Sequence, residues 1–124
     1  MSSSVYIAGV GVISAIGNNV AEHLHSFEQE KAGMGDITML NTIHKNELPV
    51  AEVKLSNEQL VAMTGLPEST SRTTLLGLVA AKEAVADAAI PDFGTLRSGF
   101  ISANTVGGMD KSEDFFVDFL ADNT

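Results

Sequence analysis

The sequence predicts an α/β fold in which a mixed sheet is flanked by helices. Short apolar runs of strand length alternate with longer segments whose apolar residues recur at helical spacing. This alternation favours at least some parallel strand pairing. The 124 residues, 44% of them hydrophobic, are enough for one modest domain with a buried core.

The first expected elements are a strand and a helix. Residues 5–13 are apolar and end in a glycine-containing turn, which predicts a core strand. Asn18 or Asn19 then caps a helix, and Glu22 stands in a capping-box position. The apolar residues expected on one face of this helix are Val20, Leu24 and Phe27. The glycines expected to end it are Gly33 and Gly35.

The middle of the chain predicts one strand and two helices. Residues 48–53 are the best strand candidate, with Pro49 at its start or on a sheet edge. Residues 56–59 form a capping box for a short helix that Gly65 and Pro67 stop. A long helix follows, which begins at Ser69, Thr70 or Ser71 and runs to Ala89. Its apolar residues, many of them alanine, cover most of its circumference and predict close backbone packing on several sides.

The last part of the chain predicts a turn at 91–94, a strand at 98–103 and a loop at 104–108. A final helix follows, with Asp110 and Glu113 expected to cap it. Its apolar residues are Phe115, Phe116, Val117, Phe119 and Leu120. So large an apolar surface on one short helix indicates a piece of a larger protein or one partner of an oligomer.

Composition excludes several classes of function. A net charge of −9 disfavours nucleic acid and anionic membrane surfaces as partners, since both attract clustered lysine and arginine. No apolar run approaches the length of a membrane span, and the start lacks the pattern of a secretory signal. The absence of cysteine excludes disulfides, thiolate metal sites and a cysteine nucleophile within these residues.

Three familiar motifs each lack residues that the motif requires. The dinucleotide pattern that Gly9 and Gly11 begin has Ser14 where its third glycine belongs. The P-loop reading of 105–112 has Asp110 where a glycine must precede the lysine, and an EF-hand reading of 110–121 lacks its glycine and glutamate. The three histidines, at positions 23, 25 and 44, are expected on the surface. We therefore expect no catalytic, cofactor-binding or metal-ligating residue within the 124 residues.

Three blocks in register resemble the β-ketoacyl-[acyl-carrier-protein] synthases of the condensing-enzyme family, close to the 3-oxoacyl-carrier-protein synthase II type. Residues 9–17 resemble the opening T-G-x-G-x-x-S-P-x-G, and residues 71–90 resemble the long core helix that ends in D-A-G-[LI]. Residues 102–109 are similar to the strand and loop G-[ST]-x-x-G-G. The residues that depart from these patterns are Ala8, Ala15, Ala89 and Thr105.

The resemblance implies that residues 1–124 are the N-terminal portion of the synthase N-terminal domain, part of the first α/β half of a thiolase-like fold. It implies decarboxylative Claisen condensation of an acyl thioester with malonyl-carrier protein, in fatty-acid or related chain elongation in the cytoplasm, without a cofactor. The nucleophilic cysteine and two histidines of the family belong beyond residue 124, so these residues alone are expected to be inactive. By the same resemblance Val106, Gly107 and Gly108 match the loop near the acyl pocket, with Val106 at an apolar gating position.

The resemblance implies acyl-carrier protein as a partner of the full-length enzyme, and a homodimer or other self-association. Family members often carry basic residues in the short helix that meets the carrier protein, whereas residues 57–63 contain none. Two alternatives remain open from the sequence. One is a non-catalytic partner subunit like those that set chain length, and the other is a small α/β domain that associates through its phenylalanine-rich end.

Overall fold

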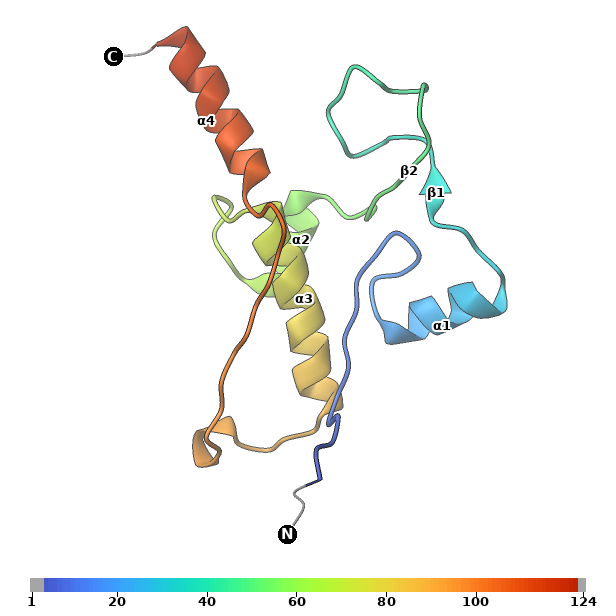
Figure 1. The fold of residues 1–124 in the computed structure, drawn as a ribbon, viewed down its shortest axis with the longest axis vertical. Coiled ribbons are helices and arrows are strands. Elements are labelled where there is room, and N and C mark those ends of the chain that lie inside the picture. The colour runs from blue at the N-terminus through green and yellow to red at the C-terminus, as the bar shows by residue number, and fades with distance from the viewer. Residues whose placement is uncertain (1–3, 123–124) are drawn as a thin grey trace.

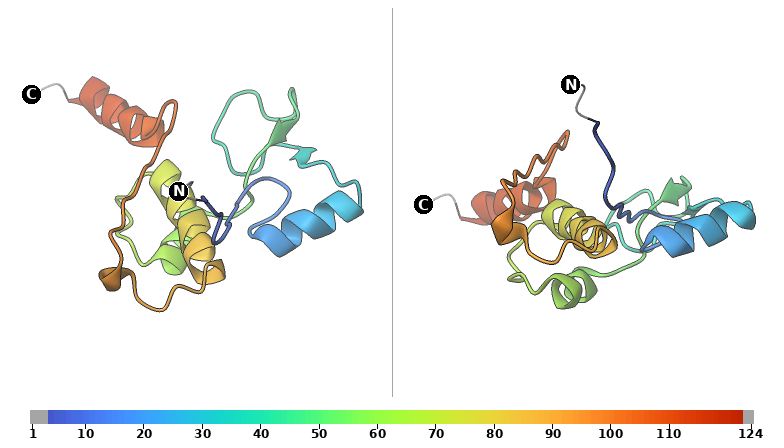
Figure 2. Two further views of the ribbon diagram at one scale, coloured as in Figure 1. Left: turned by 60° about the horizontal axis from the view of Figure 1, so that its bottom comes forward. Right: turned by 90° about the horizontal axis from the view of Figure 1, so that it is seen from below.

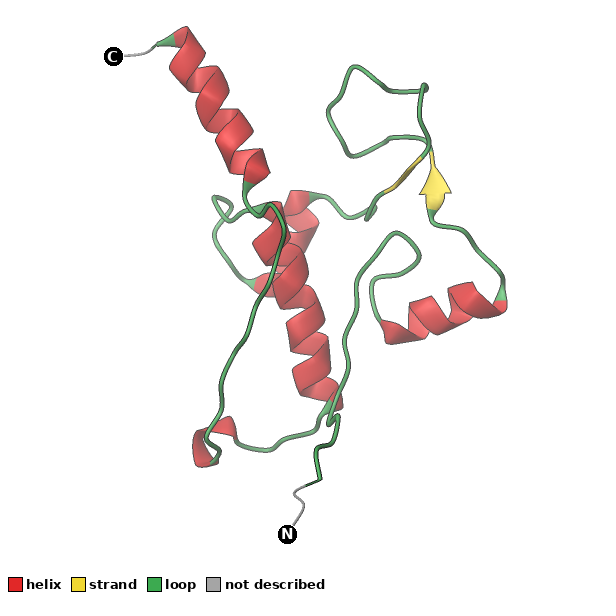
Figure 3. Cartoon of the chain, in the orientation of Figure 1, coloured by secondary structure: helices red, strands yellow, loops and turns green. Residues whose placement is uncertain are grey.

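The computed structural model describes residues 4–122, which form four α-helices and a small sheet (Figures 1 and 3). The α-helices are α1 (Val20–Glu28), α2 (Asn57–Thr64), α3 (Arg72–Asp87) and α4 (Met109–Ala121), and Phe93–Thr95 forms one 3-10 turn. The strands are β1 (Met34–Gly35) and β2 (Val50–Ala51), which pair antiparallel. The fold is therefore mixed α/β, as predicted, but its sheet within residues 4–122 is antiparallel and has two strands.

The core lies between α2 and α3, which cross next to one another at the centre of the molecule (Figure 2). Leu60 and Leu75 are fully buried there, and Val79 is nearly so. The partly buried side chains packed around these three are Ile13, Leu55, Val61, Leu66 and Leu76. Burying apolar area is the main favourable term in folding, so this cluster holds the centre of the fold together.

Both central helices begin where the sequence predicts. Ser56 accepts a hydrogen bond from the Gln59 N–H, and the Gln59 side chain accepts one from the Ser56 N–H, which completes the capping box of α2. Gly65 ends α2 with a φ of 74°, a left-handed conformation that glycine adopts freely. Ser71 caps α3 through the Thr74 N–H. The end of α3 comes at Asp87, two residues earlier than predicted.

The first extended segment, residues 5–13, lies against α3 at residues 9–12, while residues 5–7 are exposed. It pairs with no strand among residues 4–122, so the predicted core strand is wrong. Its N–H groups go to helix side chains instead. The Val10 N–H donates to Asp87 Oδ2 and the Val12 N–H to Glu83 Oε2, both at 2.9 Å. A backbone donor needs a partner, and here α3 supplies carboxylates in place of a neighbouring strand.

Glycine allows this segment to approach α3 closely. A Cβ on Gly9 would lie 2.3 Å from the Ala84 carbonyl oxygen, and one on Gly11 would lie 2.0 Å from that of Ala80. These contacts are with backbone atoms that cannot move aside cheaply. The alanine content of α3 therefore serves close backbone packing, as the sequence predicts, and the partner is the glycine-containing segment.

Helix α1 differs from prediction in its end and in its buried face. Asn19 caps it, but it ends at Glu28, several residues before the predicted glycines, and Gly35 lies in β1 instead. Leu24 and Phe27 are exposed, whereas the buried residues are His23 and Ser26. The apolar periodicity of α1 therefore predicts the wrong buried face. Hydrogen bonds of polar side chains, rather than apolar contacts, hold this helix against the preceding turn.

The C-terminal part departs most from the expected α/β pattern. Residues 98–103 are extended and exposed, with Ile101 96% exposed, and they belong to no strand of the described chain. Helix α4 extends away from α2 and α3 in Figures 1 and 2, and its phenylalanines lie on the surface. The large apolar surface that the sequence predicts is therefore exposed.

Candidate functional site

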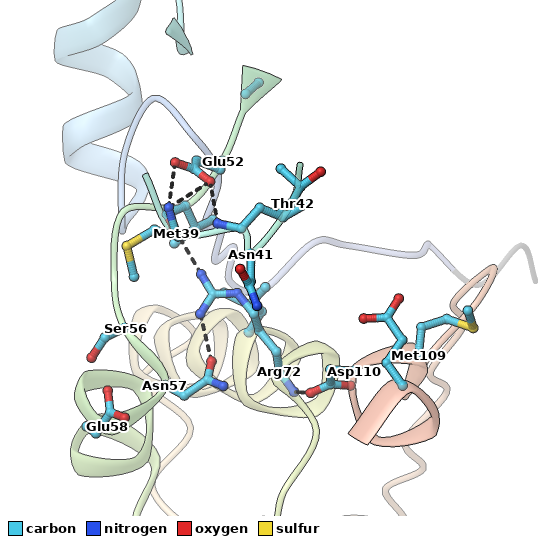
Figure 4. A pocket seen from close by; sticks show the side chains of 15 residues that line it. Met39, Asn41, Thr42, Glu52, Ser56, Asn57, Glu58, Arg72, Met109 and Asp110 are labelled. Atoms are coloured by element: carbon cyan, nitrogen blue, oxygen red, sulfur yellow. Dashed lines mark hydrogen bonds between the residues drawn. The ribbon is translucent and has the colours of Figure 1, made fainter. Parts of the chain in front are cut away.

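A cavity of about 890 Å³ lies where four parts of the chain meet (Figure 4). They are the loop between β1 and β2, helix α2, helix α3 and the start of α4. Its lining combines polar and charged side chains with apolar ones, and it lies beside the loop that the sequence singles out. The residues that line it are Met39, Leu40, Asn41, Thr42, Ala51, Glu52, Val53, Ser56, Asn57, Glu58, Arg72, Leu76, Met109, Asp110 and Glu113. We take it as the candidate site because four separate elements meet there.

Arg72 is the central side chain of the cavity. It is the first residue of α3, and its guanidinium donates to Asn57 Oδ1 at 2.8 Å and to the Val53 carbonyl at 2.9 Å. Both acceptors are neutral, and no carboxylate within residues 4–122 lies within 4.0 Å of the guanidinium nitrogens. Because a guanidinium has five N–H donors, Arg72 can bind further acceptors while it keeps both of these contacts.

Asp110 connects the cavity wall to α3. Its Oδ2 accepts the Arg72 backbone N–H at 2.9 Å, so a residue of α4 satisfies a donor at the start of α3. The prediction that Asp110 and Glu113 cap α4 is wrong. Gly108 occupies the N-cap with a φ of 83° and makes no side-chain capping hydrogen bond.

Glu52 is already fully engaged. Its carboxylate accepts the N–H groups of Met39 and Leu40 at 3.0 to 3.2 Å (Figure 4). It also accepts the Thr38 N–H at 2.6 Å, and Lys54 lies 2.8 Å away. The ammonium of Lys54 and the donors of Thr38 and Met39 hold the pKa of the Glu52 carboxyl well below its usual range. Glu52 therefore shapes the loop that borders the cavity.

Glu58 stands in the first turn of α2 at the rim of the cavity. A hydrogen bond with Ser56 lowers the pKa of its carboxyl, which keeps the group ionised at neutral pH. The site thus combines one guanidinium with ionised carboxylates. Such a set can bind a polar ligand by hydrogen bonds.

The predicted acyl-pocket loop follows directly before the part of α4 that lines the cavity. Val106 is 63% exposed, and the Gly107 N–H donates to Asn104 Oδ1 at 2.7 Å. Gly108 supplies the left-handed turn into α4. Val106, Gly107 and Gly108 directly precede the lining residue Met109 in the chain but do not themselves line the cavity. Their role toward an acyl group stays a prediction.

The sequence analysis missed one pair, Ser14 and His23. Ser14 Oγ lies 2.7 Å from His23 Nε2, and His23 Nδ1 lies 2.8 Å from the Asn19 carbonyl oxygen. A carbonyl can only accept, so His23 Nδ1 donates to the Asn19 carbonyl, and Nε2 shares a hydrogen bond with the Ser14 hydroxyl. His23 is only 7% exposed, so its predicted place on the surface is wrong.

The Ser14–His23 pair has a structural role in this turn. Ser14 Oγ also accepts the Ile16 N–H at 3.3 Å, and Ser26 donates to the Ile16 carbonyl at 2.6 Å. These bonds fasten α1 to the turn that precedes it. The spacing of Ser14 and His23 carries no helical or strand periodicity, which explains why pattern reading overlooks it.

The other two histidines are on the surface, as predicted. His25 lies 4.0 Å from Glu28, and His44 lies 2.8 Å from Glu47. No group of three or more histidine, cysteine or acidic side chains in residues 4–122 is placed to hold a metal ion. None of the helices in the described part of the chain has the length and apolar character needed to cross a bilayer.

Comparisons of the chain with protein-family models, with curated proteins and with solved structures gave no match.

Proposed function

We propose that the chain is the N-terminal part of a cytoplasmic β-ketoacyl-[acyl-carrier-protein] synthase. In this proposal it supplies scaffold and acyl-pocket residues for the condensation of an acyl thioester with malonyl-carrier protein. The reaction releases CO₂ from the malonyl group, and the resulting carbanion attacks the thioester carbon and displaces its thiol. The groups that perform these steps lie outside residues 1–124 in the proposal.

The contact between the first two motif blocks carries the proposal. The first block contains Gly9 and Gly11, and the second block is α3. The two glycines lie against the backbone of Ala80 and Ala84, where any side chain would collide with carbonyl oxygens. A spacing of glycines that the family pattern requires is thus also required by the packing of this chain.

The end of α3 gives a second, independent support. Ala89 has a φ of 49°, in the left-handed region that favours glycine. The family pattern has a glycine at this position. The backbone conformation therefore suits the residue that the pattern prescribes, although this chain carries alanine there.

A chimeric enzyme tests the proposal directly. Residues 1–124 would replace the corresponding N-terminal segment of a well-behaved β-ketoacyl synthase, and condensation would be measured as CO₂ released from malonyl-carrier protein. We expect activity from the chimera and none from the isolated chain. Condensation by the isolated chain would contradict the proposal, as would a folded chimera that is inactive.

Matched variants make the test specific. In the chimera, Gly11→Val places a side chain against the Ala80 carbonyl and is expected to abolish activity. Gly35→Ala is the control, because no atom lies within 4 Å of the position its Cβ would take. Equal effects of the two substitutions would argue against a role of the glycine contact in the synthase scaffold.

A further inference from the structure

We draw no further inference here: the strongest candidate, the exposed apolar face that Phe115, Phe116 and Phe119 form on helix α4, carries none because nothing among residues 4–122 shows what covers it.

Discussion

Helices α3 and α4 are both rich in apolar residues, yet they lie in opposite surroundings. α3 is covered by α2 on one side and by residues 8–13 on another, and Leu75 on it is fully buried. α4 carries more aromatic surface, but Phe115 is 70% exposed. Leu75 and Val79 pack against α2, and the alanines of α3 let the glycines of residues 8–13 approach the helix backbone. The difference teaches that apolar content alone does not bury a helix in this chain, because burial also needs a partner of matching shape.

The largest expected effect comes from removing a large side chain from each helix. Leu75→Ala opens a cavity in the only fully buried cluster of residues 4–122 and should lower the free energy of unfolding by about 2–5 kcal/mol. Phe115→Ala on α4 should change it by only about 0.5 kcal/mol, because Phe115 is 70% exposed. Urea denaturation measures both at low protein concentration, where chains are separate. If the two variants lost similar amounts of unfolding free energy, the contrast between a buried α3 and an exposed α4 would be contradicted.

A smaller effect is expected from the glycines that contact or belong to α3. Gly11→Ala puts a methyl group into the Ala80 carbonyl and should destabilise the chain by about 1–3 kcal/mol. Gly77→Ala is the control within the helix, since its methyl group would meet nothing within 4 Å. It should stabilise the chain by up to about 1 kcal/mol through helix propensity. If both variants shifted the midpoint of unfolding in the same direction, the explanation by close packing at Gly11 would be contradicted.

The C-terminal end of α3 offers a third test. Ala89→Gly relieves a positive φ and should raise the free energy of unfolding by about 1 kcal/mol. Ala88→Gly, one residue earlier at a φ of −61°, should instead lower it by about 0.5–1 kcal/mol. Thermal unfolding of the two variants beside the parent gives the comparison. A destabilised Ala89→Gly would show that strain at this residue is not the governing term.

The effect of pH is expected in the loop bordered by β1 and β2. The pKa of Glu52 is depressed in the folded chain, so its contribution to stability is fully present above the usual glutamate range and is lost as pH falls toward the folded pKa. Stability should therefore fall with acidification below about pH 4.5, and Glu52→Gln should flatten that slope. Denaturant titrations at several pH values between 3 and 7 measure it. An unchanged slope in Glu52→Gln would assign the acid sensitivity to other carboxyls.

Local chemistry predicted the central helices well. The capping box at Ser56, the cap at Ser71 and the left-handed Gly65 depend on residues within one turn of each other, and all three are confirmed. The presence of a strand at residues 48–53 is confirmed only as β2, and those at 5–13 and 98–103 are not found in the described chain. A strand needs a partner, and an apolar run cannot specify whether that partner exists.

The candidate site was less predictable. Arg72, Asn57 and Asp110 come from three separate helices, and no spacing in the sequence relates them. Glu83 accepts the Val12 and Val20 N–H groups, and no sequence pattern indicates either contact. Long-range hydrogen bonds of this kind depend on the fold. Sequence patterns therefore pointed to the loop of residues 106–108 beside the site, but they could not predict the polar contacts of the site.

The hydrogen bond from the Arg72 backbone to Asp110 joins residues 38 positions apart and so closes a loop of the chain. Helix α3 is the rigid part of that loop. Residues 96–104, which lead back toward the start of α3, are extended and exposed. The entropy of closing a loop grows only with the logarithm of its length, by about 0.6 kcal/mol for each doubling. We therefore expect residues 96–104 to be the part of this fold whose length can vary most between related sequences. Such a change would leave the hydrogen bond between the Arg72 N–H and Asp110 in place.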